Sequence, residues 1–185
     1  MLVLIIGDMF IPYKAHEISQ VFREKLGPNK IHQILCTGNV CVKEELDYLR
    51  TICNEIVVVR GELDDEGVSN IDQTVLTIGG FRVGLVSSVG ILPPRDPAAY
   101  ALKQRELDVD ILIHGGTHKA SAYVYDNHFY LDPGTATGAF TPLSPKPTPT
   151  FILLNVQGTT AVAYIYTLNE DGTIGVTKER FTKDE

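Results

Sequence analysis

The sequence predicts an α/β fold of four layers, α/β/β/α, in which two mixed sheets stack face to face and helices cover their outer faces. Two observations lead to this fold class. The first part of the chain alternates short aliphatic runs with amphipathic segments, the pattern of parallel strands joined by crossover helices. The later part contains short apolar runs separated by glycine-rich or polar turns, which indicates antiparallel hairpins. We expect one domain that spans residues 1–185.

The chain begins with an aliphatic run, residues 2–6, that is followed by Gly7 and Asp8. Five consecutive aliphatic residues indicate a strand buried on both faces. Ligands in open α/β sheets bind beyond the carboxyl ends of the strands, so Asp8 is placed where chemistry is expected. A structural turn residue is the simpler interpretation of one such aspartate taken alone.

The next elements repeat this pattern. We predict helices over residues 15–26 and 43–53, and buried strands over 31–36 and 55–60. In the first helix Ile18, Val21, Phe22 and Leu26 form the expected apolar stripe. Each of the three strands is followed by a glycine and a polar residue: Gly7-Asp8, Gly38-Asn39 and Gly61-Glu62.

Hairpins dominate the second half. Residues 73–78 and 81–87 flank Gly79-Gly80, and residues 122–125 and 129–131 flank a polar turn. A helix is predicted over 96–107, with Asp96 as its N-cap and Pro97 at its first position. Further strands are expected over 109–113, 151–156, 160–168 and 174–181, and the proline-rich segment 141–149 is expected to be an ordered surface loop.

Composition excludes several classes of function. A net charge of -7 opposes the phosphate neutralisation that nucleic-acid binding requires. No apolar run reaches the roughly 18 residues of a membrane helix, and we expect a cytoplasmic protein. Cys36, Cys41 and Cys53 have neither disulfide nor zinc-ribbon spacing, so free thiols are expected.

The glycine-polar pairs, together with Gly115-Gly116-Thr117-His118, resemble the framework of calcineurin-like metallophosphoesterases. Within that superfamily the chain is most similar to the family of small retromer subunits. This likeness is carried by segments 2–8, 11–12, 32–39, 59–61, 108–113, 117–119 and 133–139.

The resemblance implies a degenerate metal site. Metallophosphoesterases hold two divalent ions with carboxylates, an amide and several imidazoles. Here Asp8 and His118 remain, but Asn39 stands at the bridging carboxylate and Glu62 at the amide. Imidazole positions are occupied by Phe10, by Ser87 and Ser88, and by Gly116. We therefore predict no catalytic residue and no resident metal, with Asp8, Asn39, Glu62 and His118 as vestigial positions.

Two weaker possibilities stay open at this site. A single divalent cation would be held by Asp8, Asn39 and His118, because Ca²⁺ and Mg²⁺ accept amide oxygen. The backbone amides of residues 115–117 would form an anion-binding nest for a small molecule. His114 is interpreted as a packing or solvent-facing side chain rather than a substitute ligand.

The family likeness also implies a scaffold that acts through protein surfaces. Its former metal-site face would bind a large α-helical-repeat subunit of retromer, for which we predict Ile91 and Leu92 as contacts; the alternative is that both pack in the domain's own core. A second surface for endosomal regulators would contain Leu2, Leu26, Leu153, Tyr164 and Tyr166, with a core role as the alternative for Leu2 and Leu153.

The predicted function is that of a catalytically inactive retromer subunit in retrograde transport of cargo receptors from endosomes to the Golgi or plasma membrane. Such a chain would be cytoplasmic and recruited to endosomes through its partners, since no lipidation motif or amphipathic anchor is found. A metal-dependent phosphodiesterase with a reduced ligand set is the alternative.

Overall fold

The computed structural model describes residues 1–28, 30–87, 89 and 91–183. It contains a six-stranded and a five-stranded sheet. The first has the order β11 (Ile174–Thr182), β10 (Thr160–Leu168), β9 (Thr150–Gln157), β1 (Leu2–Ile6), β2 (Gln33–Cys36), β3 (Ile56–Val58). The second has the order β4 (Gln73–Ile78), β5 (Phe81–Val86), β6 (Ile111–Ile113), β8 (His128–Asp132), β7 (Ser121–Tyr125).

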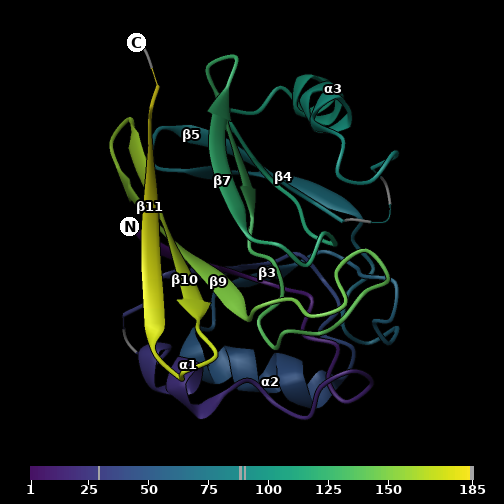
Figure 1. Ribbon diagram of the computed structural model, residues 1–185. Helices are drawn as coiled ribbons and strands as arrows, with labels where there is room; N and C mark the ends of the chain where they lie inside the picture. Colours follow the sequence, from purple (N-terminus) through teal and green to yellow (C-terminus); the bar gives the residue numbers. More distant parts are fainter. Residues whose placement is uncertain (29, 88, 90, 184–185) are drawn as a thin grey trace.

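The helices lie on the outside of these sheets. Figure 1 shows α1 (Gln20–Lys25) and α2 (Lys43–Ile52) beyond the first sheet, and α3 (Pro97–Leu107) beyond the second. The predicted four-layer α/β/β/α arrangement is therefore confirmed. As expected, β1, β2 and β3 pair in parallel, and β4–β5 and β7–β8 are antiparallel hairpins. The later half is not purely antiparallel, because β6 pairs in parallel with both β5 and β8.

Strand β1 is buried on both faces. Val3 and Ile5 contribute to the core between the two sheets, whereas Leu4 and Ile6 pack in the core beneath α1 and α2. The alternation follows from the period of two in a strand. Because the run is aliphatic at every position, it suits a central strand that has apolar layers on both sides.

Helix α1 is shorter than the pattern predicts. It begins at Gln20 instead of residue 15, because the hydroxyl of Ser19 accepts a hydrogen bond from the backbone N–H of Phe22 and caps the helix. Ile18 therefore precedes the helix, and the stripe predicted for residues 18–26 is wrong at Val21, which is exposed. In α3 the predicted N-cap is confirmed, since Asp96 accepts from the N–H of Ala98.

The parallel strands deliver their glycine-polar pairs to one edge of the molecule. Gly38, with φ of +97°, allows β2 and β3 to end in close backbone contact, since a Cβ there would lie 2.6 Å from the nitrogen of Gly61. Asp8 and Asn39 follow the ends of β1 and β2, and segment 114–118 follows β6. This edge contains the candidate site.

Candidate functional site

Asp8 and Asn39 form the centre of the site. The side-chain amide of Asn39 donates to Oδ1 of Asp8 at 2.9 Å, and the backbone N–H of Gly116 donates to Oδ2 at 2.7 Å. Both carboxylate oxygens are thus bound by protein donors, and the Asp8 side chain is fully buried. The side-chain NH₂ of Asn39 therefore points at Asp8 as a hydrogen-bond donor. To bind a cation together with Asp8, residue 39 would have to present an oxygen lone pair there instead.

Asp64 is a structural residue of the site that the sequence pattern did not single out. Its carboxylate accepts from the backbone N–H groups of Asn39, Gly61 and Cys41, while Oδ1 of Asn39 accepts from the N–H of Leu63. Asp64 therefore ties the loop after β3 to the loop after β2. An aspartate inside a short polar turn is a known signal for this role, because its side chain bonds nearby backbone amides.

The remaining vestigial positions are not assembled into a ligand set. Glu62 is exposed and lines a cleft beside the site that Asn39 and His118 also line. His118 is buried and its Nδ1 donates to the backbone oxygen of Ala139. Burial lowers the pKa of His118, so its ring is neutral near pH 7. Within the described residues no group of three or more His, Cys, Asp or Glu side chains could hold a metal ion.

Other side chains occupy the missing imidazole positions. The ring of Phe10 is buried, and its centroid lies 5.3 Å from the ring centroid of His118. Ser87 donates from its hydroxyl to the backbone oxygen of Arg60, which joins the end of β5 to the β3 loop. Ser88 lies outside the described residues. A two-metal centre does not fit these residues, because positions 10, 87 and 116 carry no imidazole and amide groups donate to both oxygens of Asp8.

The backbone nevertheless keeps a strained geometry at the site. Asp8, Phe10, Asn39 and His118 all have positive φ values, between 48° and 56°. Each such residue costs on the order of 1 kcal/mol and is retained where the surroundings determine it. The surrounding fold therefore determines the backbone conformation of these four residues in the strand-end loops.

Neither the anion nest nor His114 supplies a substitute site. The N–H of Gly116 is already used by Asp8, so the nest expected from residues 115–117 lacks its central donor. The ring of His114 is buried, stacks on Tyr100 with centroids 3.8 Å apart, and has Nδ1 3.3 Å from a carboxylate oxygen of Asp132. Its packing interpretation is confirmed, and its solvent-facing alternative is wrong.

Comparison with known proteins shows the family to which this fold belongs. Residues 1–159 match the calcineurin-like phosphoesterase superfamily domain. The chain is 38% identical to vacuolar protein sorting-associated protein 29 (Vps29) of Schizosaccharomyces pombe, over the full length of both. The chain belongs to the Vps29 family.

Solved Vps29 structures share the fold closely. That of Chaetomium thermophilum is 34% identical, covers 100% of both chains and has a TM-score of 0.94. Vps29 of Entamoeba histolytica in complex with Zn²⁺ is 41% identical and has a TM-score of 0.91; the match covers 98% of this chain and 100% of the E. histolytica chain. A further structure of C. thermophilum Vps29 contains a cyclic peptide. The Vps29 chain in it is 36% identical, with a TM-score of 0.85, and the match covers 100% of this chain and 98% of the C. thermophilum chain.

In this Vps29-family chain the two residues predicted to contact a partner, Ile91 and Leu92, lie in the loop after β5 and differ in exposure. Leu92 is 78% exposed, so its side chain is free to meet a partner. Ile91 is only 5% exposed and packs with Val86, Tyr100 and the core beneath α3. The expectation of an exposed Ile91 is wrong, because the core beneath α3 takes up this side chain.

The second predicted surface lies on the outer face of the first sheet. Leu153 pairs with Tyr164, and Tyr166 pairs with Phe151, so their side chains form rows on one face. Leu2, Leu153, Tyr164 and Tyr166 are partly exposed, and we call these four the tyrosine patch. Leu26 lies at the C-terminal end of α1, is 1% exposed and packs in the core beneath α1 and α2, so it offers no contact surface.

The buried carboxyl of Asp8 makes stability pH-dependent. Burial raises its pKa from 3.8 to about 7, with a further increase from the nearby charge of Asp132, against the opposing hydrogen bond from Asn39. Between these pH values the folded chain keeps a proton that the unfolded chain has lost. The contribution of Asp8 to the free energy of unfolding is therefore complete below about pH 4 and falls by on the order of 1.4 kcal/mol per pH unit up to about pH 7.

Urea unfolding between pH 5 and pH 8 tests this expectation, with Asp8→Asn as the variant that lacks the titrating group. The wild-type free energy of unfolding should decrease with pH more steeply than that of the variant. Parallel curves for the two proteins would contradict a raised pKa at Asp8.

Proposed function

We propose that this chain is a catalytically inactive subunit of retromer that acts through protein-binding surfaces. The observation that carries the proposal is the state of Asp8, whose two oxygens accept from Asn39 and Gly116 at the position of the former metal centre. Membership of a family named for vacuolar protein sorting supports the transport role. The cargo receptors would travel from endosomes to the Golgi or the plasma membrane.

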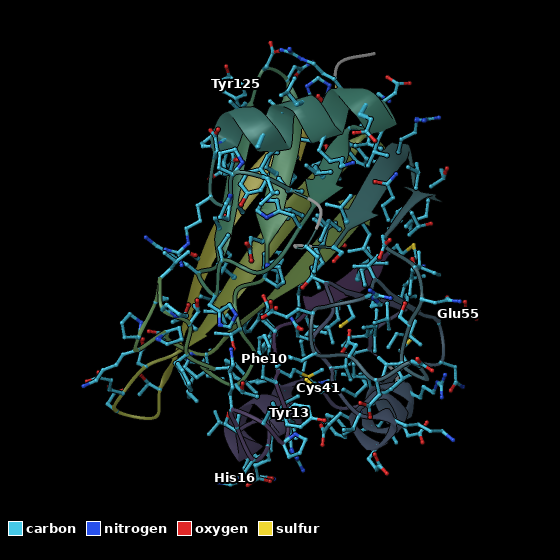
Figure 2. The ribbon with its side chains drawn as sticks, turned by 90° about the vertical axis from the view of Figure 1, so that its right-hand side faces the viewer. Phe10, Tyr13, His16, Cys41, Glu55 and Tyr125 are labelled. Atoms are coloured by element: carbon cyan, nitrogen blue, oxygen red, sulfur yellow. The ribbon has the colours of Figure 1, made fainter. Side chains whose placement is uncertain are left out.

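An apolar rim around the former metal site supports a protein partner there. A cleft of about 290 Å³ lies here, and the exposed side chain of Leu143 lines it. Four further exposed side chains each follow or precede a residue that lines the cleft, and we call the five together the cleft rim: Tyr13, Leu63, Leu92, Phe140 and Leu143. Figure 2 shows Phe10 and Tyr13 on the same side of the molecule. A patch of this kind is typical of a binding surface. The proposed occupant is the large α-helical-repeat subunit.

Two cations hold part of this rim in place. The ammonium of Lys14 donates to the backbone oxygen of Phe140 and lies 4.1 Å from the ring centroid of Phe10. From the other side, Arg95 donates to the backbone oxygens of Leu143 and Thr117. Because the loop is tied at both ends, Phe140 and Leu143 are presented at little entropic cost to binding.

The tyrosine patch is proposed as the site for endosomal regulators. It combines apolar area with hydroxyl tips, a composition typical of interfaces. Lys178, exposed, is paired with Tyr164 on the same face of the sheet. A cyclic peptide bound to Vps29 of C. thermophilum supports peptide binding in the family. No helix in the described part of the chain could span a membrane, and recruitment to endosomes is proposed to occur through partners.

A metal titration tests catalytic silence. The demetallated protein is titrated with Mn²⁺ and then Zn²⁺ by calorimetry, and assayed for hydrolysis of bis(p-nitrophenyl) phosphate with each ion. We expect no binding at micromolar concentrations and no hydrolysis above the buffer rate. Binding of two ions per chain, accompanied by hydrolysis, would overturn the proposal in favour of a phosphodiesterase with a reduced ligand set.

A single weak cation site is a second possibility that one observation favours, since Vps29 of E. histolytica was crystallised with Zn²⁺. In this chain Asp8, Asn39 and His118 would hold the ion. It would have to displace the hydrogen bonds that Asn39 and Gly116 donate to Asp8. A weak Zn²⁺ signal that disappears in His118→Ala would assign this site without restoring catalysis.

A further inference from the structure

The edge strands of the two sheets are β3, β11, β4 and β7. An edge strand presents unpaired backbone N–H and C=O groups, which proteins usually protect from other chains by charge or by cover. Strand β3 is covered by the segment that follows it, because the hydroxyl of Ser69 donates to the backbone oxygen of Val58. Strand β11 carries charged residues at 178–180, and β7 lies next to β10 and β11 of the other sheet.

Strand β4 is an uncharged edge strand. Its six residues, Gln-Thr-Val-Leu-Thr-Ile, include neither a charged residue nor a proline, and most of them are β-branched. Leu76 and Ile78 pack into the core between the sheets, whereas Gln73, Val75 and Thr77 are exposed. The core therefore holds β4 in an extended conformation while its outer side stays accessible.

The pairing of β4 with β5 determines which backbone groups of β4 are free. Ile78 pairs with Phe81 across the two-residue turn, and beyond the other end of the strand the N–H of Ser87 donates to the oxygen of Asp72. In an antiparallel pair, residues that exchange hydrogen bonds alternate with residues whose backbone groups point away. Even-numbered residues therefore bond to β5, and the N–H and C=O groups of residues 73, 75 and 77 point to the open side. Within the described part of the chain these groups make no hydrogen bond.

We propose that β4 pairs in antiparallel fashion with β4 of a second copy of this chain, which joins the two five-stranded sheets into one continuous sheet. Such a pair of identical strands is two-fold symmetric. With Val75 opposite its counterpart, residue 73 of each copy faces residue 77 of the other, and every free group of both strands gains a hydrogen-bond partner. On the exposed face the two valines meet, and Gln73 meets the hydroxyl of Thr77, both favourable cross-strand pairs.

Charge and size support this occupant and set the strength of the contact. Because β4 carries no charge, two copies meet without a like-charge pair in the strands, although each chain has a net charge of -7. Six residues per copy are fewer than the roughly 20–30 of a stable interface, so the contact belongs to the weak, transient class. Strand β4 contains no residue of the cleft rim or of the tyrosine patch, so this inference and the proposed function can fail separately.

Sedimentation equilibrium of the purified chain tests the inference. Over a range from about 10 µM to about 1 mM, we expect the weight-average mass to rise toward twice that of the monomer, as for a weak interface. Added NaCl should shift this rise to lower protein concentration, because salt screens the repulsion between two chains of charge -7. A constant monomer mass over the whole range would overturn the inference.

Val75→Lys should abolish self-association, because two ammonium groups would face each other across the two-fold axis. Val75 is 41% exposed, so the melting temperature should stay close to that of the wild type. Val124→Lys is the matched control, since Val124 is 42% exposed and lies on β7, at the other edge of the same sheet. The control should associate like the wild type. Equal loss in both variants would assign the effect to added charge and overturn the role of β4.

Mixing Val75→Lys with Val75→Glu tests the position of the two-fold axis. Each variant alone should stay monomeric, whereas the equimolar mixture should associate at least as strongly as the wild type, because opposite charges then face each other. Association of either variant alone to the wild-type extent would overturn the pairing of the two edges. A mixture that stays monomeric would overturn the register with Val75 on the axis.

Discussion

Replacing Leu92 with aspartate is expected to abolish binding to the large helical-repeat subunit while the melting curve stays nearly unchanged. The side chain is 78% exposed, so the free energy of unfolding should change by less than about 0.5 kcal/mol. In the complex, a carboxylate would be buried against apolar side chains of the partner. We expect a loss of at least about a hundredfold in affinity, as for a hot-spot residue at the centre of an interface.

Calorimetry with the purified partner measures this effect. Val21→Asp is a matched control, because Val21 is also an exposed aliphatic residue but lies on α1, in the opposite outer layer. The control should bind like the wild type. Equal binding of Leu92→Asp and Val21→Asp would show that the loop after β5 does not contact the partner.

Restoring a carboxylate at position 39 is expected to destabilise the protein strongly. Asn39→Asp removes the amide that donates to Oδ1 of Asp8 and places a second carboxylate about where that donor lies. Two buried carboxylates with no cation between them repel, and we expect a loss of about 3 kcal/mol near pH 8, or roughly 6–12 °C in melting temperature. Lowering the pH to 5 should recover part of the loss, since the pair can then share one proton.

Exchange of the two side chains provides the control for this prediction. In the double variant Asp8→Asn with Asn39→Asp, one amide again faces one carboxylate, so most of the lost stability should return. Thermal denaturation at pH 8 and at pH 5 measures both variants. A wild-type melting temperature for Asn39→Asp at pH 8 would mean that the hydrogen bond between positions 8 and 39 contributes little.

Local sequence patterns were sufficient for most of the fold. The aliphatic run before Gly7 predicted a strand buried on both faces, and β1 is buried in this way because every position in the run is apolar. The Asp96-Pro97 pair predicted the start of α3, since capping and a fixed φ act within one helical turn. Ser19 is a capping residue of the same kind and marks the start of α1. The apolar periodicity of residues 15–26 led instead to the prediction of an earlier start.

What the sequence determined by itself was therefore the order of elements, the glycine-polar pairs at the strand ends and the loss of the imidazoles at Phe10, Ser87 and Gly116. Only the tertiary structure determined which hydrogen bonds the side chains of the candidate site make. The amide of Gly116 reaches Asp8 across 108 residues of sequence, and Asp64 bonds amides in two separate loops. Ile91 turns inward while Leu92 turns outward, because side-chain direction in a loop has no periodicity and depends on which core lies next to it.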